Sequence, residues 1–259
     1  MGNTVKIRMI GYGRLAKAMA EQIAKKHQLI VSSPSLTNGT LPSGIATRSA
    51  NTADLINVDM VILAVKPQLI ATILTEITPH LPTTTVIISL AAGVDLQLLQ
   101  QLAPQHKFMV RAMPNINAQV QASMTLLLQE ANVAQHVTQM VEQLFLTLGT
   151  IAWLENDKQM DIATIFAGSG PAFACYFMQA CAKMATSLGL DADLSNKLIL
   201  NTFAGSVELA ATKNLSFADI ITQVASPNGI TAAALARLDM LEVQQRIEQG
   251  LLAAWQRLL

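Results

Sequence analysis

Short, uninterrupted apolar runs alternate with amphipathic stretches through the first half of the chain. The clearest runs are residues 59–65 (DMVILAV) and 85–90 (TVIISL). Strands that are apolar at nearly every position are buried on both faces, which is typical of a parallel sheet covered by helices. The pattern predicts strands at 5–10, 28–32, 45–47, 59–65, 85–90, 108–112, 124–128 and 151–154, and helices at 16–26, 52–56, 69–81, 94–102 and 132–147. This order predicts an α/β Rossmann domain with a doubly wound parallel sheet.

The strand pattern ends near residue 154, and the remaining sequence has helical periodicity. Helices are predicted at 159–167, 171–187, 192–213, 216–224, 229–240 and 243–257, with turn residues at the breaks. We therefore expect a dinucleotide-binding domain at residues 1–155, followed by an all-helical domain at 156–259. The mean hydropathy is high for a monomer, which indicates a large buried interface between subunits.

An uncharged stretch at residues 162–182 is long enough to span a membrane. Gly168, Ser169, Gly170 and Pro171 interrupt it, so we expect a helix start or an interface helix and no membrane partner. The chain also enters a strand pattern within its first ten residues and shows no signal peptide, so we expect a cytoplasmic protein.

The charge balance argues against one class of partner. The chain has 17 basic and 17 acidic residues, whereas bulk binding of nucleic acid needs a basic surface. We therefore expect a small-molecule substrate and no nucleic acid. No metal is expected either, because Cys175 and Cys181 have no histidine partners at zinc-like spacing. Both cysteines are predicted to be small core residues.

A glycine-rich turn follows the first predicted strand and opens the first predicted helix. Its pattern is G-x-G-x-x-A, over Gly11, Gly13 and Ala16. Gly11 permits the tight turn, Gly13 lets the backbone approach a pyrophosphate, and Ala16 allows the helix to pack closely on the strand. The free N–H groups and the positive dipole end of the helix then face the phosphates. The turn predicts a dinucleotide site, and Arg14 adds positive charge beside it.

The end of the second strand predicts which dinucleotide binds. An NAD site usually has an acidic residue there, about 20 residues after the turn, that binds the ribose 2′-OH. This chain has Ser33 and Ser35 instead, and no acidic residue between Val31 and Asp54. A serine-rich loop can surround a 2′-phosphate, so we expect NADP(H), with NAD(H) as the alternative coenzyme.

Two more strand ends are expected to face the coenzyme, since ligands of doubly wound sheets lie outside the carboxyl ends of the strands. Ala64, Val65, Lys66 and Pro67 follow one buried strand. Pro67 fixes this loop, and Lys66 is either a contact to ribose or phosphate or a solvent-exposed loop lysine. Residues 89–93 (SLAAG) end the next strand with small side chains, where a flat ring can lie.

Together these segments resemble the pyrroline-5-carboxylate reductase family. The matching segments, in the order of the family, are residues 10–16 (IGYGRLA), Asn51 with 64–68 (AVKPQ), 89–94 (SLAAGV), 111–118 (RAMPNINA), 167–173 (AGSGPAF), 188–190 (LGL) and 226–232 (SPNGITA). Each segment is weak alone, but seven of them in order are specific.

The resemblance implies reduction of 1-pyrroline-5-carboxylate to L-proline by hydride transfer from NADPH, the last step of proline biosynthesis. It implies a Rossmann domain followed by a helical dimerisation and substrate domain, through which subunits intertwine as a homodimer or a larger ring. NADPH would be held by residues 10–15, Ser33, Asn51 and the 64–67 loop, with Ala92 near the nicotinamide. Within these segments the contacts are assigned to Ile10, Gly11, Gly13, Arg14, Leu15, Ala64, Val65, Lys66 and Pro67.

The resemblance also implies where the substrate binds. The loop at residues 226–231 would hold the substrate carboxylate through backbone N–H groups around Ile230 and Thr231, and the Thr231 hydroxyl would reach the ring nitrogen. Ser226, Gly229 and Ser169 are the other expected contacts. A loop of small residues that opens a helix is a natural carboxylate cradle. Reduction of a protonated imine depends mainly on orientation, which fits a sequence with no histidine in these segments.

This chain departs from the family pattern in three of the segments. Asn228 replaces the first glycine of the usual Ser-Pro-Gly-Gly loop, Ala167 replaces a serine, and Ile116 and Asn117 stand where Thr-Pro is common. Asparagine tolerates the left-handed backbone conformation better than most residues, so we expect the turn to be kept.

Two other functions stay open at this point. A β-hydroxyacid dehydrogenase on the same architecture would use a lysine on the first long helix of the second domain, where Lys183 lies. A non-catalytic paralogue would keep the fold and bind NADP(H) as a sensor, and the change at Asn228 is its only support. Turnover of a hydroxy acid would identify the first, and NADPH binding without turnover of cyclic imines would identify the second.

Overall fold

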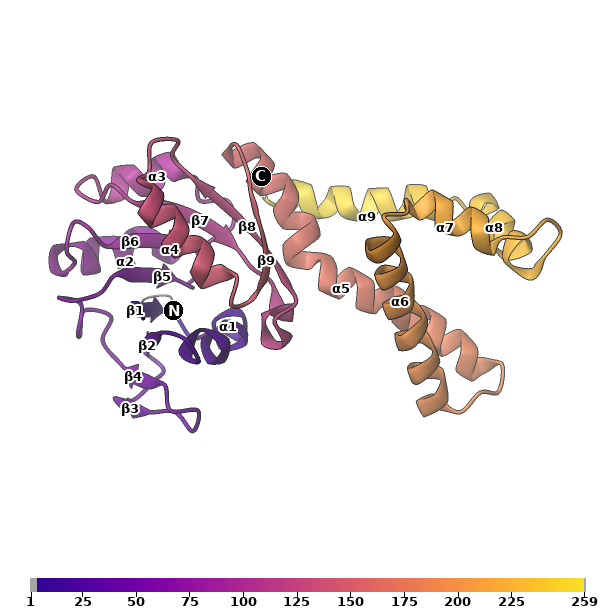
Figure 1. Cartoon of the computed structure of the whole chain (residues 1–259), viewed down its shortest axis with the longest axis horizontal. Coiled ribbons are helices and arrows are strands. Elements are labelled where there is room, and N and C mark those ends of the chain that lie inside the picture. The colour runs from indigo at the N-terminus through magenta and orange to yellow at the C-terminus, as the bar shows by residue number, and fades with distance from the viewer. Residues whose placement is uncertain (1–3, 259) are drawn as a thin grey trace. The chain divides into compact units, whose positions relative to one another are not determined.

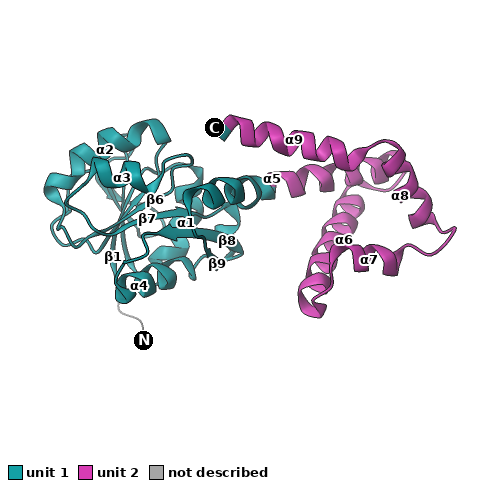
Figure 2. Cartoon of the chain, turned by 90° about the horizontal axis from the view of Figure 1, so that it is seen from above, with its two compact units in different colours: residues 1–171, 258–259 teal, residues 172–257 magenta. Residues whose placement is uncertain are grey.

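The computed structural model describes residues 4–258. The chain divides into two compact units, one of residues 1–171 with 258–259 and one of residues 172–257 (Figure 2). The division lies inside one long helix, α5 (Asp157–Ser187). The predicted domain boundary at residue 155 comes just before the start of this helix.

A single sheet of nine strands forms the centre of the first unit, counted over the described residues, in the order β3-β4-β2-β1-β5-β6-β7-β8-β9. The strands are β1 (Lys6–Ile10), β2 (Gln28–Ser32), β3 (Gly39–Thr40), β4 (Ala46–Arg48), β5 (Met60–Leu63), β6 (Val86–Ser89), β7 (Met109–Met113), β8 (Ser123–Gln129) and β9 (Gly149–Trp153). All neighbouring pairs are parallel except β3–β4 and β7–β8. The predicted Rossmann-type, mainly parallel sheet is confirmed, while β3 and the antiparallel pairs are additions to it.

Helices cover both faces of this sheet (Figure 1). One face packs against α1 (Arg14–Ala24) and α4 (Gln135–Phe145). The other packs against α2 (Ile70–Ile77), α3 (Leu96–Leu102) and the first turns of α5. Alternate residues of each strand supply the two cores, so that Ile88 of β6 lies in the first core and Ile87 in the second. This two-sided burial is the physical cause of the uninterrupted apolar runs in the sequence.

Short 3-10 helices extend or link the main elements. They are η1 (Pro67–Leu69) and η2 (Thr78–His80) at the two ends of α2, and η3 (Ile116–Val120) between β7 and β8. Together with α2, the first two cover almost all of the helix predicted at 69–81.

The helix predicted at 52–56 is wrong. Residues 51–57 form successive turns. Asp54 has a left-handed backbone, with φ +56°, and the carbonyl of Ala53 accepts a hydrogen bond from the Arg8 side chain. The left-handed dihedral angle at Asp54 is incompatible with a regular helix, and the Arg8 side chain helps to hold the Ala53 carbonyl in the turn. The connection from β4 to β5 therefore carries no helix.

The helix α5 runs without a break through the predicted interruption at residues 168–170. Pro171 lies inside it and has no backbone N–H for the carbonyl of Ala167, four residues earlier. The Asn115 side chain supplies the missing donor, with Nδ2 2.9 Å from the Ala167 oxygen. The helices predicted at 159–167 and 171–187 are therefore one helix, because a tertiary contact satisfies the carbonyl that the proline leaves open.

We expect Asn115→Ala to lower the free energy of unfolding by about 1–3 kcal/mol, because the Ala167 carbonyl loses its donor and Asn117 loses the Oδ1 that accepts from its N–H. In a Pro171→Ala background the loss should be about 1 kcal/mol smaller, since residue 171 then donates to Ala167 itself. Chemical denaturation of the four proteins at one protein concentration measures this difference. Equal losses in the two backgrounds would show that Asn115 acts through Asn117 alone.

The second unit is made of helices only, within the described residues. They are the remainder of α5 with α6 (Ala192–Lys213), α7 (Phe217–Val224), α8 (Ile230–Met240) and α9 (Val243–Leu258), which confirms the helices predicted there. Asp191 caps the start of α6, and Ser216 with Asp219 forms a capping box at the start of α7.

Almost no side chain of the second unit is buried within one chain. Ser195 is the one buried residue in the range 172–257. Large apolar side chains are exposed on every helix, among them Tyr176, Leu200, Phe217, Met240 and Leu252. Helices gain most of their stability from packing an apolar face, so these faces need another surface.

The two cysteines follow the same pattern. Cys175 and Cys181, predicted as core residues, are both exposed in the single chain. The prediction is wrong for one chain because the part of α5 that carries them has no apolar layer over it. Across residues 4–258, no helix is both long enough and apolar enough to cross a membrane.

Candidate coenzyme and substrate sites

The turn between β1 and α1 requires glycine at its first position. Gly11 has φ +96°, and its N–H donates to the Ser32 carbonyl at 2.7 Å, which ties the end of β1 to the end of β2. A Cβ at this position would lie 2.4 Å from the carbonyl oxygen of Ala64, in the backbone that follows β5. The turn therefore brings three strand ends together at a distance that only glycine allows.

The second glycine of the turn leaves open space. Gly13 is the N-cap of α1 and makes no side-chain cap, and a Cβ built on it would meet no atom of the described residues within 4 Å. The first N–H groups of α1 therefore keep free hydrogen-bonding capacity at an accessible site. Arg14 lies exposed at the start of the helix, and Leu15 is half-buried behind it. These features fit the pyrophosphate of a dinucleotide.

Hydroxyl and amide groups cluster beyond the end of β2. The Ser33 and Ser35 hydroxyls are 2.9 Å apart. The Ser32 hydroxyl donates to Asn51 Oδ1 at 3.2 Å, and Asn51 Nδ2 donates to Glu76 at 3.2 Å. Asn51 is buried, so these bonds fix it behind the serine loop.

The loop after β5 lies along the same sheet edge. The Ala64 N–H donates to the Ile10 carbonyl at 2.8 Å, while Val65 is half-buried and Lys66 and Pro67 are exposed. Ala92, after β6, is half-buried as well. The predicted coenzyme residues of the first unit are thus gathered at the carboxyl edge of the parallel strands, where ligands of this fold lie.

Sequence reasoning missed a charged pair at this edge. The Nε of Arg48, at the end of β4, is 2.6 Å from Oδ2 of Asp54. The signal that could have found it is a basic residue at the carboxyl end of a strand that neighbours β2.

The predicted substrate loop opens α8 in the second unit. Asn228 has φ +59°, so the expected left-handed conformation is confirmed. Gly229 is the N-cap of α8 without a side-chain cap, and its N–H donates to the Ser226 carbonyl at 3.0 Å. A Cβ on Gly229 would lie 2.4 Å from the Ser226 hydroxyl, which makes the turn compact. The first N–H groups of α8, at Ile230 and Thr231, are left for an outside acceptor.

The remaining predicted contact lies in the first unit. Ser169 is exposed on α5. It lies two residues after Ala167, whose carbonyl accepts the hydrogen bond from the Asn115 side chain.

Comparison with known proteins decides the family. The chain is 30% identical to the pyrroline-5-carboxylate reductase of Pseudomonas aeruginosa over 262 residues, which cover 98% of this chain and 96% of that protein. The chain belongs to the pyrroline-5-carboxylate reductase family. The reductase of Haemophilus influenzae is 29% identical, over 97% of this chain and 95% of that protein.

Solved structures of reductases of this family agree with the fold. The pyrroline carboxylate reductase of Plasmodium falciparum, solved with NADP bound, superposes with a TM-score of 0.89 at 27% identity and covers 98% of this chain and 97% of that one. The 1-pyrroline-5-carboxylate reductase of Streptococcus pyogenes has a TM-score of 0.87 at 29% identity, with 99% of each chain covered.

Family models match both halves of this reductase-family chain. Residues 6–93 match "NADP oxidoreductase coenzyme F420-dependent", and residues 157–258 match "pyrroline-5-carboxylate reductase dimerisation". The second match indicates self-association, which agrees with the uncovered apolar faces of the second unit.

The dehydrogenase alternative has only the fold in its favour. The 3-hydroxyisobutyrate dehydrogenase of Mycobacterium tuberculosis superposes with a TM-score of 0.51 at 15% identity, which is a likeness of architecture alone. Lys183, the lysine that this alternative would use, is exposed on α5.

Proposed function

We propose that the chain reduces 1-pyrroline-5-carboxylate to L-proline with NADPH, the last step of proline biosynthesis. The observation that carries the proposal is a pair of uncapped helix N-termini, at Gly13 and at Gly229, in a chain of this family. An uncapped N-terminus offers N–H groups to an anion. In our proposal the start of α1 takes the pyrophosphate, and the start of α8 takes the substrate carboxylate.

The coenzyme would lie along the carboxyl edge of the sheet. Its proposed contacts are Ile10, Gly11, Gly13, Arg14, Leu15, Ser33, Ser35, Asn51, Ala64, Val65, Lys66, Pro67 and Ala92. When bound, NADPH supplies the hydride. The serine hydroxyls and the absence of an acidic residue at the end of β2 favour NADPH over NADH.

The substrate would be oriented by the loop that opens α8. The N–H groups of Ile230 and Thr231 would hold the carboxylate, with Ser226, Gly229 and Ser169 as further contacts. The Thr231 hydroxyl would accept a hydrogen bond from the protonated ring nitrogen. Because the imine can arrive protonated, these residues need to orient it and tolerate its charge, and no general acid is required.

We further propose that residues 156–259 act as the dimerisation and substrate domain and intertwine with those of a second copy, in a homodimer or a larger ring. The dimerisation match that begins at residue 157 supports this boundary. The absence of a nucleic-acid partner and a cytoplasmic location stay predictions from the sequence.

The loss of NADPH absorbance with 1-pyrroline-5-carboxylate, with proline measured as product, tests the proposed function. We expect proline to form, faster with NADPH than with NADH. Oxidation of a hydroxy acid without imine reduction would favour the dehydrogenase alternative. NADPH binding without turnover of any cyclic imine would favour the non-catalytic paralogue.

The Thr231 hydroxyl makes no hydrogen bond within the described part of the chain, so its removal isolates its role toward substrate. We expect Thr231→Val to lower kcat/KM for the imine about ten- to a hundredfold, with NADPH affinity unchanged. Thr231→Ser, which keeps the hydroxyl, is the matched control and should retain most of the activity. If kcat/KM is unchanged in Thr231→Val, the Thr231 hydroxyl does not contact the substrate.

A further inference from the structure

Arg48 lies beside the serine loop at the end of β2. In the pairing of β2 with β4, Arg48 is opposite Ser32. The Ser33 N–H donates to the Arg48 carbonyl at 3.2 Å, so the backbones of the two residues are in direct contact. The sequence from Val31 to Ala53 contains no acidic residue, and Arg48 is its one charged residue.

Two hydrogen bonds hold the Arg48 guanidinium. Its Nε donates to Asp54 at 2.6 Å, and its Nη1 donates to the Thr47 carbonyl at 2.9 Å. The third nitrogen, Nη2, has no hydrogen bond to the described part of the chain. The side chain is 30% exposed, so an outside anion can reach it.

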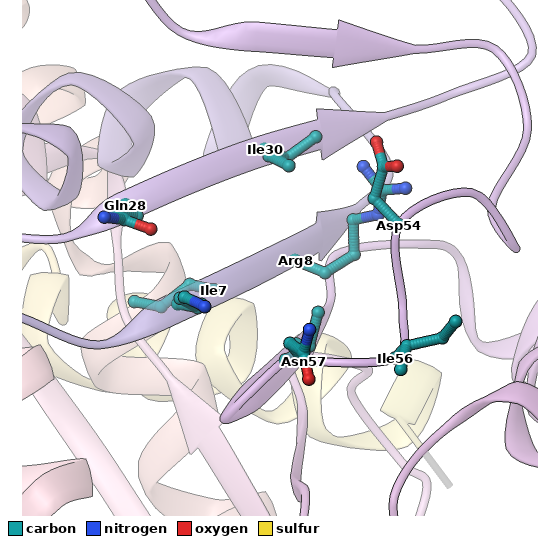
Figure 3. A pocket seen from close by; sticks show the side chains of 9 residues that line it. Ile7, Arg8, Gln28, Ile30, Asp54, Ile56 and Asn57 are labelled. Carbon is teal, nitrogen blue, oxygen red and sulfur yellow. The ribbon is translucent and has the colours of Figure 1, made fainter.

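A second arginine lies close to the same carboxylate. Arg8 of β1 and Asp54 line one cavity of about 400 Å³ (Figure 3), which the helix-free connection from β4 to β5 leaves beside β1 and β2. The Arg8 side chain is buried, and its Nε and Nη1 have no hydrogen-bond partner among residues 4–258. Burial lowers the pKa of Arg8 to about 10, so the group stays charged at neutral pH. Arg8, Arg48 and Asp54 together therefore carry one net positive charge.

We propose that Arg48 is the residue that selects the 2′-phosphate of NADP(H), and that Asp54 holds its guanidinium in the free site while competing with the phosphate for it. This inference rests on the proposed function, because it names the residue by which the proposed coenzyme is distinguished from NAD(H). An arginine near the end of the second strand is a known means of accommodating a 2′-phosphate. Here it comes from the neighbouring strand β4, and the Ser33 and Ser35 hydroxyls, which follow the end of β2, are further donors.

Asp54 interacts with two arginines, and it binds only one of the three nitrogens of the Arg48 guanidinium. Arg8 also attracts Asp54, the acidic neighbour that acts against the lowering of its pKa by burial. A phosphate can bind Nη2 while Nε stays with Asp54. The negative charge of Asp54 then repels the phosphate and weakens its binding to the guanidinium, which is how the two compete.

Calorimetric titration with NADP+ and with NAD+ tests the role of Arg48 without relying on turnover. We expect Arg48→Gln to weaken NADP+ binding about ten- to a hundredfold, as for loss of a charge-assisted hydrogen bond, and to leave NAD+ binding within about twofold. Lys26→Gln, an exposed cation just beyond the far end of α1, is the control and should change neither.

The outcomes separate the two proposals. If Arg48→Gln keeps the wild-type ratio of NADP+ to NAD+ affinity, the role of Arg48 is overturned while the proposed reductase function stands. If the wild-type protein binds neither coenzyme, the proposed function fails and this inference fails with it.

Asp54→Asn tests the second half of the inference. Asparagine can still accept from Arg48 Nε, but it removes the negative charge that competes with the phosphate. We expect NADP+ to bind a few-fold more tightly and NAD+ to bind unchanged, in low salt. No gain for NADP+ would overturn the competing role of Asp54, and a loss of NAD+ affinity would make Asp54 a ribose ligand instead.

Discussion

Gly11→Ala is expected to abolish measurable binding of both coenzymes and to destabilise the first unit by about 2–4 kcal/mol. Gly11 has φ +96°, where an L-residue is strained, and the added methyl would lie 2.4 Å from the Ala64 carbonyl oxygen. That oxygen belongs to backbone, so no side chain can turn aside to relieve the clash. The ends of β1, β2 and β5 would have to separate, and they frame the proposed pyrophosphate site.

Gly13→Ala is the matched control, since it adds the same methyl two residues away. Gly13 has φ −77°, and a methyl there would meet no atom of the part of the chain that the structure describes within 4 Å. Alanine should therefore change the free energy of unfolding by less than about 0.5 kcal/mol. The methyl would nevertheless occupy the space proposed for the pyrophosphate and weaken both coenzymes. Thermal unfolding and titration with NADP+ separate the two effects. If Gly13→Ala still binds NADP+ tightly, the pyrophosphate does not bind at this turn.

Much of the fold could be predicted because the relevant physics is local. Strands buried on both faces are apolar throughout, so β5 and β6 are easily recognised in the sequence. Where a helix has capping residues, its first and last residues can also be predicted accurately. The helix expected at 192–213 matches α6, which begins after the Asp191 cap and ends at Lys213, before the C-cap residue Asn214 with φ +51°. The coenzyme turn is equally local, because its function depends on glycines spaced within six residues.

The missed features depend on contacts between distant residues. Pro171 and its neighbours predict a break when only the local sequence is considered. The hydrogen bond from the Asn115 side chain, far away in the chain, satisfies the carbonyl that Pro171 leaves open inside α5. The turns at 51–57 likewise depend on Arg8, which draws the Ala53 carbonyl toward β1. The pair of Arg48 and Asp54 becomes visible only when β4 is placed beside β2.

Burial in the second unit can be predicted in kind but not in detail. The high mean hydropathy indicates a subunit interface, but the sequence of one chain does not say which apolar residues face the partner. The prediction that Cys175 and Cys181 are core residues rests on the usual burial of small apolar stretches. In one chain those stretches are exposed, and the dimerisation match at 157–258 explains why they need not be covered there.

Arg111→Met is expected to lower the free energy of unfolding by about 2–4 kcal/mol. Arg111 of β7 is almost completely buried and pairs with two carboxylates of α5, Asp157 and, at 2.7 Å, Asp161. Asp157 also accepts from the N–H of Leu96 at the start of α3. Methionine keeps the unbranched stem of arginine as far as the position of Nε, so most of the loss comes from two carboxylates left together without a cation.

The companion variants separate this ion network from simple packing. Arg111→Met combined with Asp157→Asn and Asp161→Asn removes both unpaired charges and should recover part of the lost stability, because neutral replacement of a buried ion network is often tolerated. Arg48→Gln breaks an exposed pair and should cost less than about 1 kcal/mol. Urea denaturation compares the variants at one protein concentration, because any self-association makes the apparent stability depend on concentration. If the triple variant is no more stable than Arg111→Met, the lost free energy of unfolding comes from the packing of the arginine side chain. The ion pairs of Arg111 with Asp157 and Asp161 then contribute little to holding α5 against the sheet.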